Sequence, residues 1–223
     1  MSSKIIIIEG LDGCGKSTQL ELLQGRFPDC RFLTFPNYQS PAGEIITEYL
    51  EGDIRDSHPE HSAYSASTFY AADRYISYRK DWCVDYLSGR TIISARYTTS
   101  NAIYQMTKLD RSVWESYCEW LYDYEYNKLG IPAPDAVIFL DVPVEISQKL
   151  LTERYAGDEK KKDVHEADAD YLRRCREAVR YAAGHDPHAK WYMLDCCYDG
   201  EMRPPISIHR DLVRLIEELR QEN

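Results

Sequence analysis

The sequence lacks the cysteine and histidine patterns of disulfide-rich and metal-binding proteins. None of its seven cysteines stands in a Cys-x-x-Cys pair, and the adjacent Cys196 and Cys197 have poor geometry for a disulfide. We therefore expect reduced thiols in a cytoplasmic protein. The six histidines show no metal-ligand spacing either, and His185 and His188 flank an Asp-Pro pair that is typical of a surface loop.

Long apolar runs and excess positive charge are also missing. No run approaches the length of a membrane span, and a strand-like segment begins almost at once, so we expect neither a membrane segment nor a signal peptide. The net charge of −10 disfavours nucleic-acid binding as the main function. A chain of 223 residues with an ordinary apolar content can form one α/β domain with a substantial core.

Short apolar runs alternate with helix-like segments along the whole chain. Strands are expected at residues 4–9, 31–35, 91–94, 136–141 and 191–194. Helices are expected from Ser17 onward and at 42–50, 61–87, 110–127, 144–155 and 206–220. This alternation predicts an α/β fold, in which helices cover both faces of a five-stranded parallel sheet in three layers. Since no repeat or linker interrupts it, residues 1–223 are expected to form a single domain.

One segment differs from the rest of the chain. Residues 154–172 read RYAGDEKKKDVHEADADYL, which is dense in charge and poor in large apolar side chains. Such a segment can be the solvated end of a helix, or it can be a mobile lid over a phosphate site. The sequence leaves both interpretations open.

The stretch IIIIEGLDGCGKST, residues 5–18, carries the clearest functional signal. It fits the pattern G-x-x-x-x-G-K-[ST], after a predicted strand and at the start of a predicted helix. Glycines allow a loop whose N–H groups converge on phosphate, and the start of the helix adds a partial positive charge. Lys16 supplies a cation for the β and γ phosphates, and the Ser17 hydroxyl can bind Mg²⁺.

The motif predicts a P-loop NTPase-type fold that binds ATP. The residues expected to contact ATP are Gly10, Asp12, Gly13, Cys14, Gly15, Lys16, Ser17 and Thr18. A P-loop does not name the reaction, because switch proteins, transport ATPases and small-molecule kinases all carry one.

Three further clusters stand where an open α/β sheet binds ligands, at strand ends or on the following helix. They are FPNY at 35–38, FYAADR at 69–74 and ARYTTSNAIY at 95–104. With the P-loop and its internal acid, they resemble the thymidylate kinase family over nearly the whole chain. In that family the third cluster begins Asp-Arg-Tyr or Asp-Arg-His and continues with Ser, Asn and Tyr at the spacing found here.

The resemblance implies a role for each matching residue. Tyr70 matches the aromatic that stacks on thymine, and Arg74 matches the arginine that bonds a thymine carbonyl. Ser100 and Asn101 match contacts to the base edge. Tyr104 matches the residue that fills the space of a ribose 2′-hydroxyl. Taken singly, the two tyrosines could be core aromatics, and Arg74 could pair with an acid of a neighbouring helix.

The resemblance also implies how phosphate is held. Asp12 matches the acid at the acceptor's 3′-hydroxyl, and Tyr38 and Arg96 match groups on the acceptor phosphate, beside Phe35 and Pro36. Family members without an arginine in the P-loop carry basic residues in the lid. Here these are Arg154, which we favour as a catalytic cation beside Lys16 and Arg96, and Lys160, Lys161 and Lys162.

The activity implied is transfer of the γ-phosphoryl group of ATP to dTMP, with Mg²⁺ and without a covalent intermediate. Related enzymes are homodimers that pair through long helices, so a homodimer is expected, with residues 61–87 as a candidate face. A kinase for another deoxynucleotide and a nucleotide-binding protein of low turnover are the alternatives. Both remain open because the sequence departs from the family at two positions.

Asn37 stands where the family commonly has arginine, and Ala95 stands where it has the Asp of Asp-Arg-Tyr. Alanine can neither orient water on Mg²⁺ nor hold a nearby cation. Glu9, Asp12 and Asp141 are the acids close enough in sequence to strand ends to compensate. Ala95→Asp is expected to raise kcat, unless another acid has already taken over, in which case it would be neutral or harmful.

Overall fold

The computed structural model describes residues 3–54, 58–154 and 169–222. Its centre is a five-stranded sheet in the order β2-β3-β1-β4-β5, in which all neighbouring strands are parallel. The strands are β1 (Ile5–Glu9), β2 (Arg31–Thr34), β3 (Ile92–Ala95), β4 (Ala136–Asp141) and β5 (Lys190–Asp195). The β1 strand is buried throughout, because it lies in the middle of the sheet with helices on both faces.

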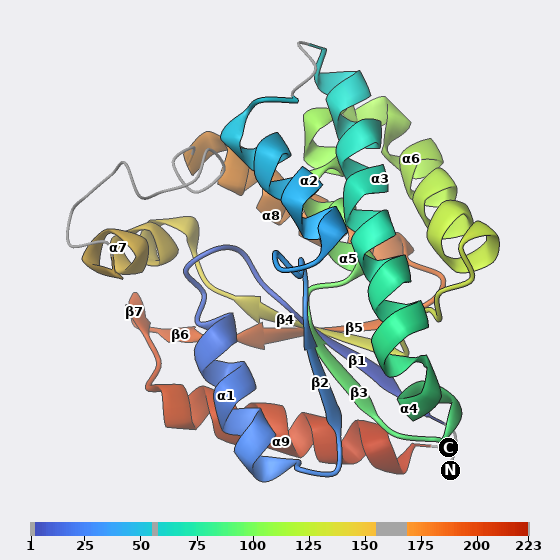
Figure 1. Cartoon of the computed structure of the whole chain (residues 1–223). Coiled ribbons are helices and arrows are strands. Elements are labelled where there is room, and N and C mark those ends of the chain that lie inside the picture. Colours follow the sequence, from blue (N-terminus) through green and yellow to red (C-terminus); the bar gives the residue numbers. More distant parts are fainter. Residues whose placement is uncertain (1–2, 55–57, 155–168, 223) are drawn as a thin grey trace.

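Helices cover the two faces of the sheet in separate layers, which confirms the predicted α/β class (Figure 1). On one face, α1 (Lys16–Arg26) and α9 (Pro205–Gln221) pack against the apolar side chains of Ile6 and Ile8. On the other face, α5 (Thr98–Tyr104) and α8 (Ala169–His185) pack around Phe139. The remaining α-helices are α2 (Pro41–Glu51), α3 (Pro59–Ser77), α4 (Cys83–Leu87), α6 (Trp114–Tyr122) and α7 (Val144–Arg154).

Two predicted helices are more irregular than the sequence indicated. Between α3 and α4 the chain forms a π-helical turn at Tyr78–Trp82, and α6 lies between a 3₁₀ turn at Arg111–Val113 and a π-helical segment at Asp123–Lys128. A further 3₁₀ turn, Met106–Lys108, follows α5. Such local changes in winding are difficult to predict from an apolar pattern, because they extend over only about one turn.

The sequence analysis missed α5, α8 and a small hairpin. Residues 169–172, which we had assigned to the charged segment, begin α8, and Tyr171 and Leu172 are buried there. The buried residues of this helix follow helical spacing, but they alternate with many arginines, so the segment reads as a continuation of the charged stretch before it. The hairpin pairs β6 (Cys197–Tyr198) with β7 (Glu201–Met202) through a tight turn, whose residues Asp199 and Gly200 have φ of 48° and 78°.

All seven cysteines are free thiols, of which Cys83 and Cys197 are partly exposed and the other five are buried. Among the described residues, no helix is long and apolar enough to cross a bilayer. Burial raises the pKa of the Cys118 and Cys175 thiols to about 12. At pH 8 only about one in ten thousand of these groups would be thiolate, the form that reacts.

We therefore expect a thiol reagent such as Ellman's reagent to label at most two cysteines quickly in the native protein at pH 8. All seven should react after unfolding in guanidinium. The double variant Cys83→Ser/Cys197→Ser serves as the control and should lose the fast phase. Rapid labelling of three or more thiols in the native protein, or a fast phase that survives in the double variant, would contradict the described burial.

Candidate active site

A cavity of about 650 Å³ opens where β1, β2 and β3 end. Most residues that the sequence predicted for ATP and acceptor phosphate line it, namely Asp12, Gly13, Cys14, Gly15, Lys16, Ser17, Thr18, Phe35, Pro36, Tyr38 and Arg96. Thr34, Ala95, Leu150 and Leu151 complete the wall. The cavity thus joins the loop after β1 to the segments after β2 and β3, as expected for ligand binding at the carboxyl ends of parallel strands.

The loop after β1 has left-handed backbone at Gly13 and Gly15, a conformation that favours glycine. Gly13 has φ of 81°, and a Cβ atom there would lie 2.7 Å from the carbonyl oxygen of Ser147. Gly15 has φ of 86° and directly precedes α1, whose first turn adds Lys16 and Ser17 to the cavity wall. The amide groups at the start of a helix favour anions, so the loop is suited to a phosphate chain.

Lys16 lies across the loop that precedes it. Its Nζ atom donates hydrogen bonds to the carbonyl oxygens of Gly10, at 2.6 Å, and Leu11, at 2.9 Å. These bonds hold the cation at the cavity wall. The position of the Lys16 side chain is therefore set by the P-loop itself.

A second cation, Arg96, lies on the other side of the cavity and is held by Asp12 and Tyr104. Arg96 forms an ion pair with Asp12, and its guanidinium carbon lies 4.9 Å from the centre of the Tyr104 ring. The Tyr104 hydroxyl donates to Asp12 Oδ2 at 3.3 Å. Although burial disfavours the charge, Tyr104 and Asp12 raise the pKa of Arg96 well above its usual value.

The backbone of Arg96 is left-handed, with φ of 66°. This conformation costs free energy for a residue with a side chain, and such residues concentrate at functional sites. Burial raises the pKa of Tyr104 well above its usual value, so its hydroxyl stays protonated and can donate. The arrangement presents two fixed cations, Lys16 and Arg96, to one cavity, as a phosphoryl-transfer site requires.

Comparison with known proteins agrees with this geometry. Residues 8–195 match the family model described as thymidylate kinase. The chain belongs to the thymidylate kinase family. It is 30% identical over 203 residues to the thymidylate kinase of Mycobacterium tuberculosis, covering 87% of this chain and 92% of that protein. It is also 30% identical over 223 residues to a probable thymidylate kinase of Thermococcus kodakarensis, covering 96% and 97%.

Solved structures agree at the level of the fold. The thymidylate kinase of Candida albicans superposes with a TM-score of 0.72 at 22% identity, covering 98% of this chain and 93% of that one. That of Ehrlichia chaffeensis has a TM-score of 0.64 at 19% identity, covering 97% and 100%.

The segment after β2 is fixed by a buried acid that the sequence analysis did not single out. Asp73 of α3 is 1% exposed and accepts hydrogen bonds from the Asn37 amide and the Ser40 hydroxyl, both at 2.8 Å. The side-chain oxygen of Asn37 accepts from a backbone amide two residues later. At the position of the family arginine, Asn37 therefore stabilises a turn and supplies no charge. Tyr38 follows at the rim of the cavity and is 53% exposed.

The residues predicted to contact the base form a buried group. Arg74 and Glu125, 2% and 0% exposed, make two parallel hydrogen bonds of 2.7 and 2.5 Å. Asn101 donates to Glu125 at 3.3 Å. Arg74 thus pairs with an acid of another segment, which is the structural role that the sequence analysis left open for it. Tyr70 of α3 is partly buried, and neither it nor Arg74 lines the 650 Å³ cavity, so their contacts with a base stay a prediction.

Glu125 is the functional neighbour that the sequence analysis missed. It lies 51 residues from Arg74, in the π-helical segment after α6, and it also accepts from the Thr98 hydroxyl at 2.8 Å. Glu115, Glu119 and Asp123 stand in the same aromatic-rich stretch, so the sequence offered no signal that singled out Glu125 as the buried acid.

Of the predicted lid cations, only the backbone of Arg154 lies in the described part of the chain. Arg154 is the last residue of α7, but its side chain is outside the described part of the chain. Lys160, Lys161 and Lys162 lie outside the described residues altogether. Leu150 and Leu151 of α7 reach the cavity wall, so the helix that leads into the predicted lid borders the site. The role of Arg154 as a catalytic cation remains a prediction.

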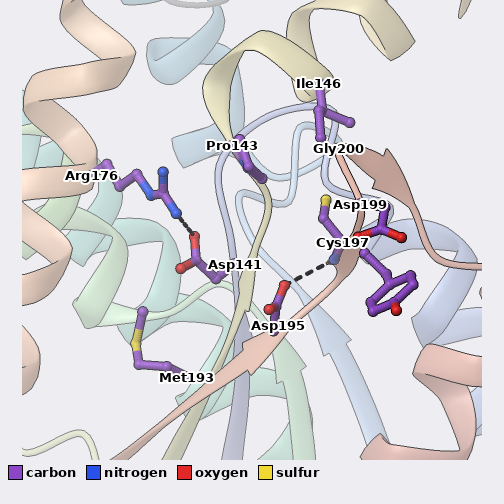
Figure 2. A pocket seen from close by; sticks show the side chains of 10 residues that line it. Asp141, Pro143, Ile146, Arg176, Met193, Asp195, Cys197, Asp199 and Gly200 are labelled. Carbon is purple, nitrogen blue, oxygen red and sulfur yellow. Dashed lines mark hydrogen bonds and ion pairs between the residues drawn. The ribbon is translucent and has the colours of Figure 1, made fainter.

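Asp141, one of the three acids considered as a substitute for the missing Asp, lies in a different place. It ends β4 and pairs with Arg176 of α8 at 2.7 Å. Figure 2 shows both residues in a smaller cavity of about 320 Å³, with Asp195 at the end of the neighbouring strand. Asp141 is not among the residues that line the P-loop cavity.

Proposed function

We propose that this chain transfers the γ-phosphoryl group of ATP to dTMP, giving dTDP and ADP. The observation that carries the proposal is the cavity that the P-loop shares with Arg96, which Asp12 and Tyr104 hold in place, in a chain of the thymidylate kinase family. Lys16 approaches the triphosphate and Arg96 the acceptor phosphate, so the two phosphates can be aligned while their charge is neutralised. No covalent intermediate is needed.

The residues present fit a magnesium ion that arrives with the nucleotide. Among the described residues, no group of three or more His, Cys, Asp or Glu could hold a metal alone. Ser17 places an exposed hydroxyl in the cavity wall, which suits an ion held mainly by phosphate and water. When bound, Mg²⁺ supplies charge neutralisation at the β and γ phosphates. Asp12 and Tyr104 orient Arg96, and they limit the space that is available to the sugar of the acceptor nucleotide.

A coupled ADP-release assay with a panel of deoxynucleoside monophosphates tests the proposal. We expect ADP release with Mg·ATP to depend on an added monophosphate, and dTMP to give the highest kcat/KM. Preference for another deoxynucleotide would identify a different acceptor. Absence of acceptor-dependent turnover, with ATP still bound, would support a nucleotide-binding protein of low turnover.

Tyr104→Ala is expected to narrow the preference of the enzyme for deoxyribose. Tyr104 is 7% exposed and bonds Asp12, so its ring occupies space beside the predicted sugar position. Removing it should reduce the ratio of kcat/KM for dTMP over its ribose analogue by about tenfold. Tyr104→Phe keeps the ring and should keep the ratio. A ratio that is unchanged in the alanine variant would remove Tyr104 from the sugar pocket.

We further propose a cytoplasmic homodimer that pairs through residues 61–87. Tyr75 of α3 and Val84 and Leu87 of α4 are 38%, 78% and 72% exposed, so this segment presents apolar side chains that a second copy of the chain could cover. Sedimentation of the purified chain with and without Val84→Glu measures the contribution of this surface. A monomer in both cases would refute the proposal.

A further inference from the structure

Glu9 is a buried acid with an unusual bonding pattern beside the cavity. It is the last residue of β1 and is 0% exposed. Its Oε1 atom accepts from the hydroxyls of Thr99 and Ser100, both at 2.7 Å. Its Oε2 atom is buried and has no hydrogen-bond partner among the described residues. A carboxylate in such a place is costly unless a nearby positive charge compensates.

Arg96 is the cation that Glu9 can serve. Ile8 and Ala95 are paired in the register of β1 with β3, and the Arg96 amide donates to the Ile8 carbonyl at 3.2 Å. Glu9 and Arg96 therefore leave neighbouring strands next to each other. Burial has the largest effect on the pKa of Arg96 and lowers it. Tyr104, Asp12 and then Glu9 follow, and each of these three raises that pKa.

The two strand ends place their side chains on opposite faces of the sheet. Ala95 belongs to the apolar cluster under α1 and α9, whereas Glu9 bonds the first turn of α5. Glu9 thus does not occupy the place of the missing carboxylate. Its carboxylate lies on the α5 side of the sheet, while Asp12 pairs with the Arg96 guanidinium from the P-loop.

We propose that Glu9 supplies the negative charge that Arg96 lacks because residue 95 is alanine, and that Glu9 is a positioning residue for Arg96. Of the other two acids considered, Asp141 lies in a separate cavity, and Asp12 already forms the direct ion pair. With Glu9 and Asp12 on two sides, the left-handed Arg96 keeps its guanidinium at the cavity wall. This inference rests on the proposed phosphoryl transfer and assigns to it a residue outside the lining of the cavity.

Glu9→Gln removes the charge and keeps both the size of the side chain and an oxygen for Thr99 and Ser100. We expect kcat with dTMP to fall at least tenfold, while the KM for ATP changes less than twofold and the midpoint of thermal unfolding does not fall. Thr99→Val is the matched control, because it removes a hydrogen bond to Glu9 but leaves the charge. It should retain kcat within threefold. An equal loss in both variants would show that Glu9 only anchors α5.

Ala95→Asp in the parental enzyme tests the inference even if Glu9→Gln folds poorly. In the parental enzyme, Ala95→Asp should leave kcat unchanged or lower it, because a third carboxylate would then surround Arg96. In the Glu9→Gln background it should raise kcat at least threefold. Equal effects in the two backgrounds, a raised kcat in the parental enzyme, or a Glu9→Gln variant with more than half of parental kcat would overturn the inference. A parental enzyme without acceptor-dependent turnover would instead refute the proposed function.

Discussion

Lys16→Ala is expected to lower kcat at least about a thousandfold while leaving the protein folded. Lys16 is held by the carbonyl oxygens of Gly10 and Leu11 at the wall of the cavity, outside the apolar core. Removing one preorganised charge from a site of phosphoryl transfer costs about 4 kcal/mol of transition-state stabilisation, or roughly a thousandfold in rate. Steady-state kinetics with saturating Mg·ATP and dTMP measure the loss.

Lys128→Ala is the control for this variant, because Lys128 is 68% exposed and pairs with Asp123 at the surface. Its kcat should match that of the parental enzyme. Thermal unfolding of both variants should stay within a few degrees of the parental midpoint. If Lys16→Ala kept more than a tenth of the parental kcat, the assignment of the loop to the transferring phosphate would be wrong.

The parts of the site that the sequence predicted are those encoded by neighbouring residues. Residues 10–17 contain the whole P-loop pattern, and the positive φ angles of Gly13 and Gly15 give a local reason for glycine at these positions. The buried strands were equally legible, since Ile5–Glu9 and Ala136–Asp141 are continuous runs that only a covered parallel sheet accommodates.

Pairings between distant residues could not be read in the same way. Asp73 is adjacent to Arg74 in the sequence, yet the first fixes the turn at Asn37 while the second turns inward to Glu125. Both residues are buried, and the partner that each one meets depends on how α3 packs, which is a property of the assembled fold. The helix α8 was missed for a different reason, because its apolar stripe is interleaved with arginines and directly follows a charged segment.

Glu125→Gln is expected to destabilise the protein by about 4 kcal/mol, since it leaves the buried Arg74 without a counter-charge. Burial disfavours the charge of Arg74, but Glu125 raises the pKa of Arg74 above its usual value. The guanidinium therefore stays charged in the parental protein. For a chain of this size the loss corresponds to a fall of about 10 °C in the unfolding midpoint. Denaturant titration and thermal unfolding both measure it, and a fall of less than about 3 °C would contradict the ion pair described.

The double variant Arg74→Met/Glu125→Leu separates stability from substrate binding. It removes both charges, and apolar side chains of similar volume should restore most of the stability lost in Glu125→Gln, because a buried ion pair repays little more than its own desolvation. If Arg74 only holds Glu125, turnover with dTMP should return together with the stability. If Arg74 also bonds the thymine ring, the double variant should fold well and still show a KM for dTMP raised at least tenfold, with the KM for ATP unchanged. The second outcome is the one we expect, because the first turn of α5 brings Asn101 to the same carboxylate and so places both predicted base contacts on one buried anchor.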